Sequence, residues 1–333
     1  LLVEDVGQYA KPIITDWNGD GRKDLICGNE TGNVYLFQRG TETIGSGTYV
    51  PKFLPSEKIK VSGADIDIGA FASPFVCDWN NDSGKDLIVG EDYGNIRLFI
   101  NTSHSPSEPP VFNASQYVDG NPEPIDIGGY SKPQVIDWNN DGKKDIIVGE
   151  EFGQVALFLN SGRDEDPLFT GEFFFVEKSG TTTLEIKLKS ASPYPCDWNN
   201  DYKKDLIAGD EYGYVWVFIN SATNDAPIFN KGTYAVQSGN LPIDVGYDAT
   251  PCVIDYNNDG KKDLLIGDRY GNIRLFSNTN TDEAPLFSEP TTIQSGVGNN
   301  ASPFVIDYNK DGKKDLLVGV EDGTIWLFIN SGT

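Results

Sequence analysis

Short apolar segments alternate with polar stretches rich in Gly, Pro, Asn and Asp along the whole 333-residue chain. Residues 133–138, 145–150 and 154–160 are typical, because each run is six or seven residues long and rich in Val, Ile, Leu and Phe. Runs of this length between turn-forming residues predict β-strands, and no segment keeps a helical period. Residues 111–118 supply a further, outer strand of the same kind. The pattern therefore predicts an all-β protein built from antiparallel strands.

This pattern recurs six times. Each copy begins with a proline-led apolar segment, passes through an acidic loop into two further apolar runs, and ends in a variable stretch. The aspartate that opens the acidic loop occupies positions 16, 78, 137, 197, 255 and 307, so successive copies are 52 to 62 residues apart. Four antiparallel strands repeated at this interval are typical of a propeller blade. We therefore predict that residues 1–333 fold as a single six-bladed β-propeller with four-stranded antiparallel blades.

The two ends of the chain are expected to close the ring. The sixth copy stops after its third strand, at "TIWLFINSGT", and so lacks a fourth strand of its own. The first residues, "LLVEDVGQYAKP", align with the segment "PEPIDIGGYSKP" that joins two copies. We expect this N-terminal segment to complete the last blade, which would leave no open sheet edge.

The acidic loops carry oxygen-bearing side chains at regular intervals. Their common form is D-[WY]-N-x-D-x-x-K-D, and loops 1 to 6 span residues 16–24, 78–86, 137–145, 197–205, 255–263 and 307–315. Side-chain oxygens fall at loop positions 1, 3, 5 and 9, and the main-chain carbonyl at position 7 can turn inward. Hard cations such as calcium take six to eight oxygen ligands, and the first turns of an EF-hand loop use the same alternation. The spacing therefore predicts up to six calcium sites.

Each predicted site draws on loop positions 1, 3, 5, 7 and 9. In chain order the candidate ligands are Asp16, Asn18, Asp20, Arg22, Asp24, Asp78, Asn80, Asp82, Gly84, Asp86, Asp137, Asn139, Asp141, Lys143, Asp145, Asp197, Asn199, Asp201, Lys203, Asp205, Asp255, Asn257, Asp259, Lys261, Asp263, Asp307, Asn309, Asp311, Lys313 and Asp315. Position 6 favours glycine, because a left-handed turn costs glycine nothing. Ser83 and Tyr202 occupy position 6 in loops 2 and 4, so we expect these two loops to bind calcium more weakly.

Composition limits the class of partner. The formal net charge of −24 would repel the phosphates of nucleic acid, so we predict no nucleic-acid partner. The loops hold three carboxylates each, and six calcium ions would reduce the net charge to about −12. No stretch of 18 apolar residues occurs, so we predict no membrane span. A basic, apolar leader is also missing, as expected of a mature or excised fragment.

The repeats resemble the FG-GAP or VCBS type, through motifs such as "DWNNDGKKDIIVGE". Repeats of this type form calcium-loop blades in integrin α-subunit propellers, in fungal lectins of the Psathyrella velutina type, and in some bacterial polysaccharide lyases and adhesins. The resemblance covers essentially the whole chain and implies that loop positions 1, 3, 5 and 9 hold calcium. It also implies an extracellular or cell-surface location, where millimolar calcium would fill even weak sites.

The face opposite the acidic loops is predicted to carry aromatic residues. It is built from the turns between second and third strands and from the loops that lead into first strands. The candidate ligand-binding residues are Tyr93, Phe152, Tyr212 and Tyr270 in the turns, and Tyr9, Phe71, Tyr130 and Tyr247 in the loops. Sugar rings stack on exposed aromatic rings, and neighbouring carboxylates accept hydrogen bonds from sugar hydroxyls. The alternative interpretation is that these rings pack between blades.

The sequence contains no nucleophile elbow, phosphate loop or zinc-ligand spacing, and its lone histidine, His104, lies in a stretch of surface composition. Acidic pairs such as Glu91–Asp92 recur in several copies, whereas a catalytic pair would be expected once. We therefore predict a non-enzymatic, extracellular, calcium-stabilised propeller that binds carbohydrate. Two alternatives stay open: a protein-binding or adhesion propeller similar to the integrin head, and a module of a polysaccharide-degrading enzyme. The predicted partner is accordingly a glycan or an extracellular protein.

Overall fold

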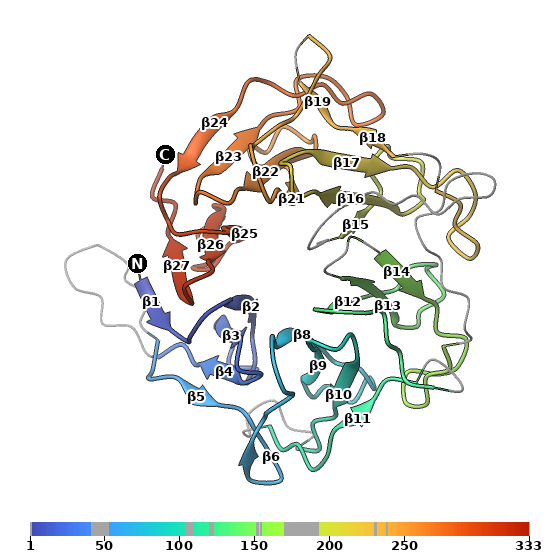
Figure 1. Cartoon of the computed structure of the whole chain (residues 1–333), viewed down its shortest axis with the longest axis vertical. Helices are drawn as coiled ribbons and strands as arrows, with labels where there is room; N and C mark the ends of the chain where they lie inside the picture. The colour runs from blue at the N-terminus through green and yellow to red at the C-terminus, as the bar shows by residue number, and fades with distance from the viewer. Residues whose placement is uncertain are drawn as a thin grey trace.

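The computed structural model describes residues 2–40, 53–103, 110–119, 123–150, 153, 155–169, 193–229, 232–237 and 239–332. Six antiparallel sheets surround a central axis, and Figure 1 looks along that axis. Five of the sheets contain four described strands and the third contains three. The described residues contain no helix, and hence none that could cross a membrane. The predicted all-β, six-bladed propeller is therefore confirmed.

Each sheet is a meander whose strands take the same order from the centre outward (Figure 1). The innermost strands are β2 (Lys11–Thr15), β8 (Ser73–Cys77), β12 (Lys132–Ile136), β15 (Tyr194–Cys196), β21 (Thr250–Ile254) and β25 (Ser302–Ile306). The second strands are β3 (Asp24–Gly28), β9 (Asp86–Gly90), β13 (Asp145–Gly149), β16 (Asp205–Gly209), β22 (Asp263–Gly267) and β26 (Asp315–Gly319). The third strands are β4 (Val34–Phe37), β10 (Ile96–Phe99), β14 (Val155–Phe158), β17 (Val215–Phe218), β23 (Ile273–Phe276) and β27 (Thr324–Phe328).

The outer strands are short. They are β5 (Glu57–Lys58), β11 (Gln116–Tyr117), β18 (Thr233–Tyr234), β24 (Thr291–Gln294) and, in the sixth sheet, β1 (Leu2–Asp5). Two small hairpins accompany them: β6 (Lys60–Val61) with β7 (Ala64–Asp65), and β19 (Val236–Gln237) with β20 (Leu241–Pro242). Residues 111–118 were predicted as one strand, but only Gln116 and Tyr117 pair with β10. Within that range Phe112 instead makes isolated bridges to Asn101 and Val61, so its side chain is held inside the blade junction.

Blades 6 and 1 are in direct contact. β1 pairs antiparallel with β27, with Leu2 opposite Trp326 and Asp5 opposite Thr324. At the end of β26, Gly319 approaches the first blade so closely that a Cβ atom there would lie 2.5 Å from Pro12 Cδ. Glycine is required at this position because any side chain would collide with the neighbouring blade.

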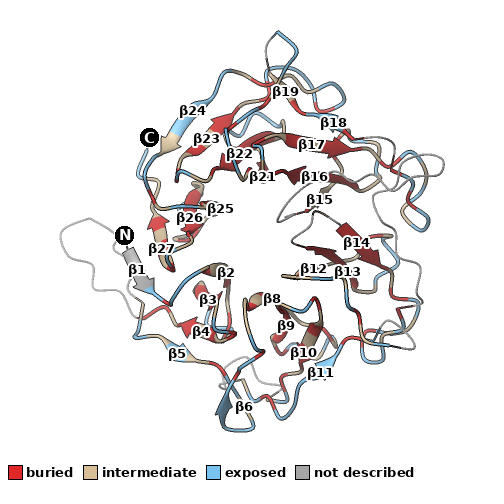
Figure 2. Ribbon diagram, in the orientation of Figure 1, coloured by how far each residue is buried: buried red, intermediate tan, exposed pale blue. Residues whose placement is uncertain are grey.

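The hydrophobic core lies between the blades. Every residue of the second strands is buried, because each sheet is covered on both faces by its neighbours (Figure 2). The aromatic residue at loop position 2 packs against a phenylalanine of the next blade; Trp138 and Phe229, for example, have ring centroids 6.0 Å apart. The same pairing joins Trp17 to Phe112, Trp79 to Phe169 and Trp198 to Phe287. Five of the six acidic loops are therefore anchored by a ring buried in an interblade core, and in loop 5 the Tyr256 ring is half-buried.

Candidate functional site

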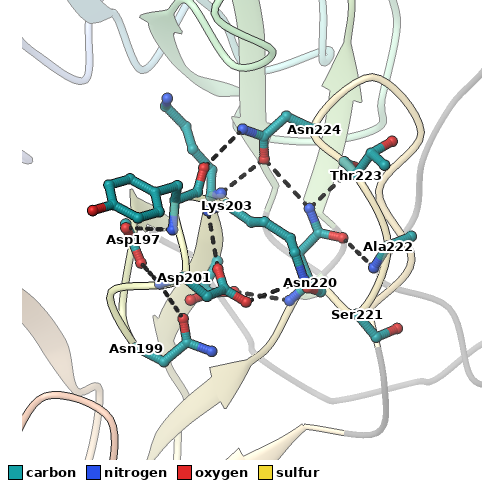
Figure 3. Close-up of polar contacts among 12 residues, drawn as sticks. Asp197, Asn199, Asp201, Lys203, Asn220, Ser221, Ala222, Thr223 and Asn224 are labelled. Atoms are coloured by element: carbon teal, nitrogen blue, oxygen red, sulfur yellow. Dashed lines mark hydrogen bonds and ion pairs between the residues drawn. The ribbon is translucent and has the colours of Figure 1, made fainter.

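The six acidic loops join the innermost strand of each blade to the second strand, and all six have the same winding. In loop 4 the Asp197 carboxylate accepts a hydrogen bond from the main-chain N–H at position 6, at 2.9 Å. Asn199 Oδ1 accepts from Asp201 N at 3.1 Å, and Asp201 Oδ1 accepts from Lys203 N at 2.9 Å (Figure 3). These local bonds wrap the main chain around its own side chains, which brings the oxygens of positions 1, 3 and 5 together.

The aspartate at position 9 is the first residue of the second strand and is fully buried. In loop 3, Asp145 accepts hydrogen bonds from Trp138 N at 2.8 Å and from Asn160 N at 2.7 Å. Burial raises the pKa of Asp86, Asp145 and Asp205 to about 6, although the main-chain hydrogen bonds oppose this shift. The position-9 carboxylate is thus held rigidly at the base of the loop by two main-chain donors.

The aspartate at position 5 lies in the opposite electrostatic environment. Burial alone would raise the pKa of Asp141, but hydrogen bonds from Lys143 and Asn139 and the charge of Lys143 outweigh it and lower the pKa. The Lys143 ammonium lies 3.3 Å from Asp141 Oδ2, and the side-chain hydrogen bond of Arg22 lowers the pKa of Asp20 in loop 1. In loops 1, 3, 4 and 5 the basic side chain at position 7 therefore supplies a counter-charge to the position-5 aspartate, which the sequence pattern did not predict, whereas position 7 of loop 2 is Gly84.

The donor set fits a hard divalent cation. Three carboxylates, one amide oxygen and one main-chain carbonyl per loop are the oxygen ligands that calcium takes. Two carboxylate oxygens at position 1, Asp16 Oδ1 and Asp78 Oδ1, are buried without a hydrogen-bond partner, a costly state that a cation would relieve. Across the described part of the chain, no group of three or more His, Cys, Asp or Glu side chains is already arranged around a metal position. Calcium coordination therefore stays a prediction for all six loops.

Loops 2 and 4 keep this winding without glycine at position 6. Ser83 has a φ of 75° and Tyr202 a φ of 66°, in the left-handed region that glycine adopts in the other loops. Their N–H groups still reach the position-1 carboxylate, at 3.0 and 2.9 Å. A residue with a Cβ atom pays about 1–2 kcal/mol in this conformation. At position 6 this strain thus occurs only in the two loops that were predicted to bind calcium more weakly.

A recurrent asparagine after the third strand also supports the loops, and the sequence interpretation missed it. Its main-chain N–H donates to the position-9 aspartate in blades 2 to 6; these residues are Asn101, Asn160, Asn220, Asn278 and Asn330. Its side chain holds the following loop, as Asn220 Oδ1 does by accepting from Ala222 N at 3.1 Å (Figure 3). The signal in the sequence was the asparagine two residues after the "LF" or "VF" pair of the third strand in blades 2 to 6, as in "LFIN" and "VFIN".

The turns on the opposite face present exposed tyrosines. In blade 4 the buried Asp210 accepts hydrogen bonds from Tyr212 N, Tyr214 N and the Trp216 indole, so this acid organises the turn. The tyrosine two residues after the buried acid then projects outward: Tyr93 is 73% exposed, Tyr212 is 52% exposed and Tyr270 is 59% exposed. Phe152, the corresponding candidate in blade 3, lies outside the described residues.

Three candidates in the loops that lead into first strands pack on one another. Tyr9, Phe71 and Tyr130 each lie two residues before an innermost strand, at φ values of 53–58°. Their ring centroids are 5.2 Å apart for Tyr9 and Phe71, and 4.4 Å apart for Phe71 and Tyr130, both edge to face. We call these three residues the inner arc. All three rings are half-buried, so the packing interpretation describes them better than that of free ligand contacts.

Three candidates, Tyr212, Tyr247 and Tyr270, lie where blades 4 and 5 meet. Tyr247, 43% exposed, packs edge to face on Tyr270 at 6.2 Å, and the Arg269 guanidinium lies 5.0 Å from the Tyr247 ring centroid. Arg269 Nε also contacts Asp248 Oδ2 at 2.6 Å. The hydrogen bond to Glu211 raises the pKa of Tyr212, and the neighbouring Tyr247 adds to that shift. We call Tyr212, Tyr247 and Tyr270 the tyrosine cluster.

Comparison with known proteins gives the repeat type. Residues 137–208 and 255–318 match the FG-GAP-like repeat. Integrin alpha-7 of Mus musculus is 28% identical over 151 residues, which make up 44% of this chain and 12% of that protein. Integrin alpha-IIb of Mus musculus is 30% identical over 158 residues, which make up 41% of this chain and 14% of that protein. The chain thus matches only a small part of the length of each integrin.

Solved structures with the same overall fold come from different kinds of protein. A lectin from Agrocybe aegerita, described for its specific recognition of non-reducing terminal N-acetylglucosamine, gives a TM-score of 0.52 at 16% identity, over 98% of this chain and 81% of the lectin. BBS1N, in its complex with ARL6DN, gives a TM-score of 0.51 at 10% identity, over 99% of this chain and 95% of that chain. At these identities the likeness shows the fold alone. Two stretches of this six-bladed propeller, residues 137–208 and 255–318, are therefore similar to FG-GAP-like repeats.

Proposed function

We propose that this propeller of FG-GAP-like repeats is an extracellular, calcium-stabilised binding protein that recognises carbohydrate, without catalysis, on the face opposite its acidic loops. The observation that carries the proposal is the tyrosine cluster. Tyr212, Tyr247 and Tyr270 expose between 43% and 59% of their surface at one blade junction. Their flat rings can stack against the C–H faces of a sugar. Polar groups beside such an aromatic surface then fix the orientation of the ligand.

The polar groups next to the tyrosine cluster suit a polyhydroxylated ligand. The carboxylates of Asp248 and Glu211 accept hydrogen bonds from hydroxyl groups, while the Arg269 guanidinium donates them. The Arg269–Asp248 ion pair holds both side chains in place before a ligand arrives, which lowers the entropic cost of binding. The fold shared with the lectin from Agrocybe aegerita and the similarity to integrins support a binding role for this propeller.

Calcium in this proposal is structural. Positions 1, 3, 5 and 9 and the main-chain carbonyl of position 7 would hold up to six ions, one per loop. When bound, the ion neutralises the crowded carboxylates and ties the innermost strand to the second strand. Because it binds the folded chain and not the unfolded one, it stabilises the ring by mass action. The oxygen-only donor set and the two buried, unpartnered oxygens of Asp16 and Asp78 support this assignment.

A glycan array probed in millimolar calcium tests the recognition proposal. We expect the wild-type protein to bind selected glycans and a Tyr212→Ala, Tyr247→Ala, Tyr270→Ala variant to lose this binding. The matched control is Tyr202→Gly, which removes a tyrosine that is 90% exposed in acidic loop 4 on the opposite face. This control should bind as the wild type does. Equal binding by the triple variant and the wild type would contradict the proposed site.

The alternative is recognition of a protein, which the integrin relatives favour. Two results together would favour a protein ligand over carbohydrate. The array would show no bound glycan in the presence of calcium, and a purified extracellular protein would bind saturably. The same triple variant distinguishes the two faces in that case, because a protein bound elsewhere would not respond to loss of the tyrosine cluster.

A further inference from the structure

Hydrogen bonds join successive acidic loops around the ring. The lysine at position 8 of one loop donates to the asparagine side chain at position 4 of the loop before it. These contacts are Lys144 to Asn81 at 2.7 Å, Lys204 to Asn140 at 3.0 Å, Lys262 to Asn200 at 2.6 Å and Lys314 to Asn258 at 2.6 Å. Each of four consecutive blade junctions therefore has the same type of lysine–asparagine contact between its two loops.

Both partners in each contact sit beside candidate calcium ligands. The position-4 asparagine lies between ligand positions 3 and 5, with a φ of 59–60° in all four loops. Its amide oxygen therefore points at the next blade only while the loop keeps its winding. The position-8 lysine directly precedes the buried aspartate at position 9. A change in the winding of one loop thus displaces the asparagine that the lysine of the next loop contacts.

Two of the four lysines, Lys144 and Lys262, are held firmly on their own blades by an aspartate. Asp164 accepts from both Lys144 N at 2.9 Å and Lys144 Nζ at 2.8 Å, and Asp282 holds Lys262 in the same way at 2.8 Å for both contacts. The ammonium group is thereby fixed before it reaches across to the neighbouring loop. If the neighbouring loop unwound, this cation would lose its amide partner. The contact therefore stabilises the wound form of that loop, and its loss would cost free energy.

Loop 1 lacks the contact on both of its sides. Its own position 4 is Gly19, which has no side chain to accept a hydrogen bond from blade 2. Position 4 of loop 6 is Lys310, a cation where the other loops carry an amide oxygen, so Lys23 of loop 1 meets no such acceptor there. The lysine–asparagine contacts therefore form an open string from loop 2 to loop 6 and stop at the junctions with loop 1. The junction of blades 6 and 1 has a different contact, in which Arg39 donates its main-chain N–H to Asp24 at 2.8 Å and its guanidinium to the Tyr308 carbonyl at 2.9 Å.

We propose that loops 2 to 6 are energetically coupled through this string, so that calcium in one loop raises the calcium affinity of its neighbours, whereas loop 1 lies outside the string. The inference rests on the proposed calcium binding and adds to it an order among the sites. An ion that fixes the winding of one loop places the asparagine acceptor for the next lysine, and the lysine in turn steadies its own loop. Because coupling of binding free energies is reciprocal, the effect runs in both directions along the string.

Calorimetric titration of two single-loop variants with calcium tests the coupling. Asp197→Asn with Asp201→Asn disables loop 4 inside the string, and Asp16→Asn with Asp20→Asn disables loop 1 outside it. Each variant should bind one ion fewer than the wild type. Loss of loop 4 should also raise the dissociation constants of its neighbouring sites about fivefold, at the low end of measured couplings. Loss of loop 1, which lies outside the string, should change the remaining sites much less than loss of loop 4 does.

A second variant removes the contact but keeps the ligands. Asn140→Gly with Asn200→Gly preserves the left-handed backbone, since glycine adopts it freely and loop 1 already has Gly19 at this position. This variant should bind the same number of ions as the wild type with a less steep titration, and its melting curve in chelator reports whether it folds. Equal effects of the loop 1 and loop 4 variants, or an unchanged slope in the glycine variant, would overturn the coupling alone. A wild-type protein that binds no calcium would overturn both the coupling and the calcium assignment.

Discussion

The two faces of the propeller differ in how strictly they repeat. On the face of the acidic loops, which we call the metal face and metal loops after the calcium proposed to bind there, the N–H at loop position 6 donates to the carboxylate at position 1 within 2.9–3.0 Å in all six blades. On the aromatic face, the third residue of the turn between second and third strands changes from blade to blade; the described residues include Thr31, Tyr93, Tyr212, Tyr270 and Asp322. Uniform geometry is what a structural role requires of every blade. Because the side chain at this turn position varies, one blade junction can differ from the others, as the junction with the tyrosine cluster does.

The largest effect on stability is expected from the buried aspartate of a metal loop. Asp145→Ala leaves the N–H groups of Trp138 and Asn160 buried without an acceptor, and each unsatisfied group costs about 1–3 kcal/mol. We expect a loss of about 3 kcal/mol in the free energy of unfolding, measured by urea denaturation in chelator so that lost calcium does not contribute.

Asp65→Ala is the matched control for that variant. Asp65 is exposed in β7 and lies 3.8 Å from the Lys58 ammonium, and such surface ion pairs contribute roughly 0–1 kcal/mol. The account would be wrong about the metal face if the two aspartate variants lost the same stability.

A smaller effect of opposite sign is expected where a metal loop departs from the shared pattern. Tyr202→Gly removes a side chain from a residue with a φ of 66°, and relief of this strain should raise the free energy of unfolding by about 1 kcal/mol. Gly142→Ala places a Cβ atom at a φ of 85° in loop 3 and should lower it by a similar amount. Thermal denaturation of both variants in chelator measures the pair. Destabilisation by Tyr202→Gly would show that the tyrosine has contacts that offset its strain.

The smallest effect on stability is expected on the aromatic face. The Tyr212→Ala, Tyr247→Ala, Tyr270→Ala variant removes exposed rings, so its free energy of unfolding should stay within about 0.5 kcal/mol of the wild type for each ring. Phe71→Ala serves as the contrast, because the Phe71 ring packs between Tyr9 and Tyr130 and its loss should cost about 2 kcal/mol. A large loss of stability in the triple variant, seen by chemical denaturation, would assign the tyrosine cluster to packing.

The repeated pattern was sufficient to predict the fold and the position of the acidic loops between strands, because both depend on local spacing. Strand type followed from apolar runs between turn residues, and the winding of each loop followed from Asp and Asn at alternate positions. The outer strand in blade 2 was predicted too long, since the sequence does not show that Phe112 leaves the sheet to fill the junction with Trp17.

Contacts between distant residues could not be predicted in this way. Lys144 meets Asn81 across 63 positions of the chain, and only the curvature of the ring brings the two together. The same holds for the aromatic face, where sequence alone could not separate packed rings from exposed ones. Tyr130 and Tyr247 occupy similar loops, but Tyr130 packs on Phe71 while Tyr247 lies exposed beside Tyr270.

Thermal denaturation in millimolar calcium and in chelator, followed by circular dichroism, tests the central claim that bound cations stabilise the ring through the metal loops. Each independent site filled at 100 times its dissociation constant would add ~2.7 kcal/mol, so six filled loops should raise the midpoint by about 20 °C. The account predicts this shift, together with calcium found by elemental analysis of protein purified without chelator. Superimposed melting curves and protein free of metal would contradict it.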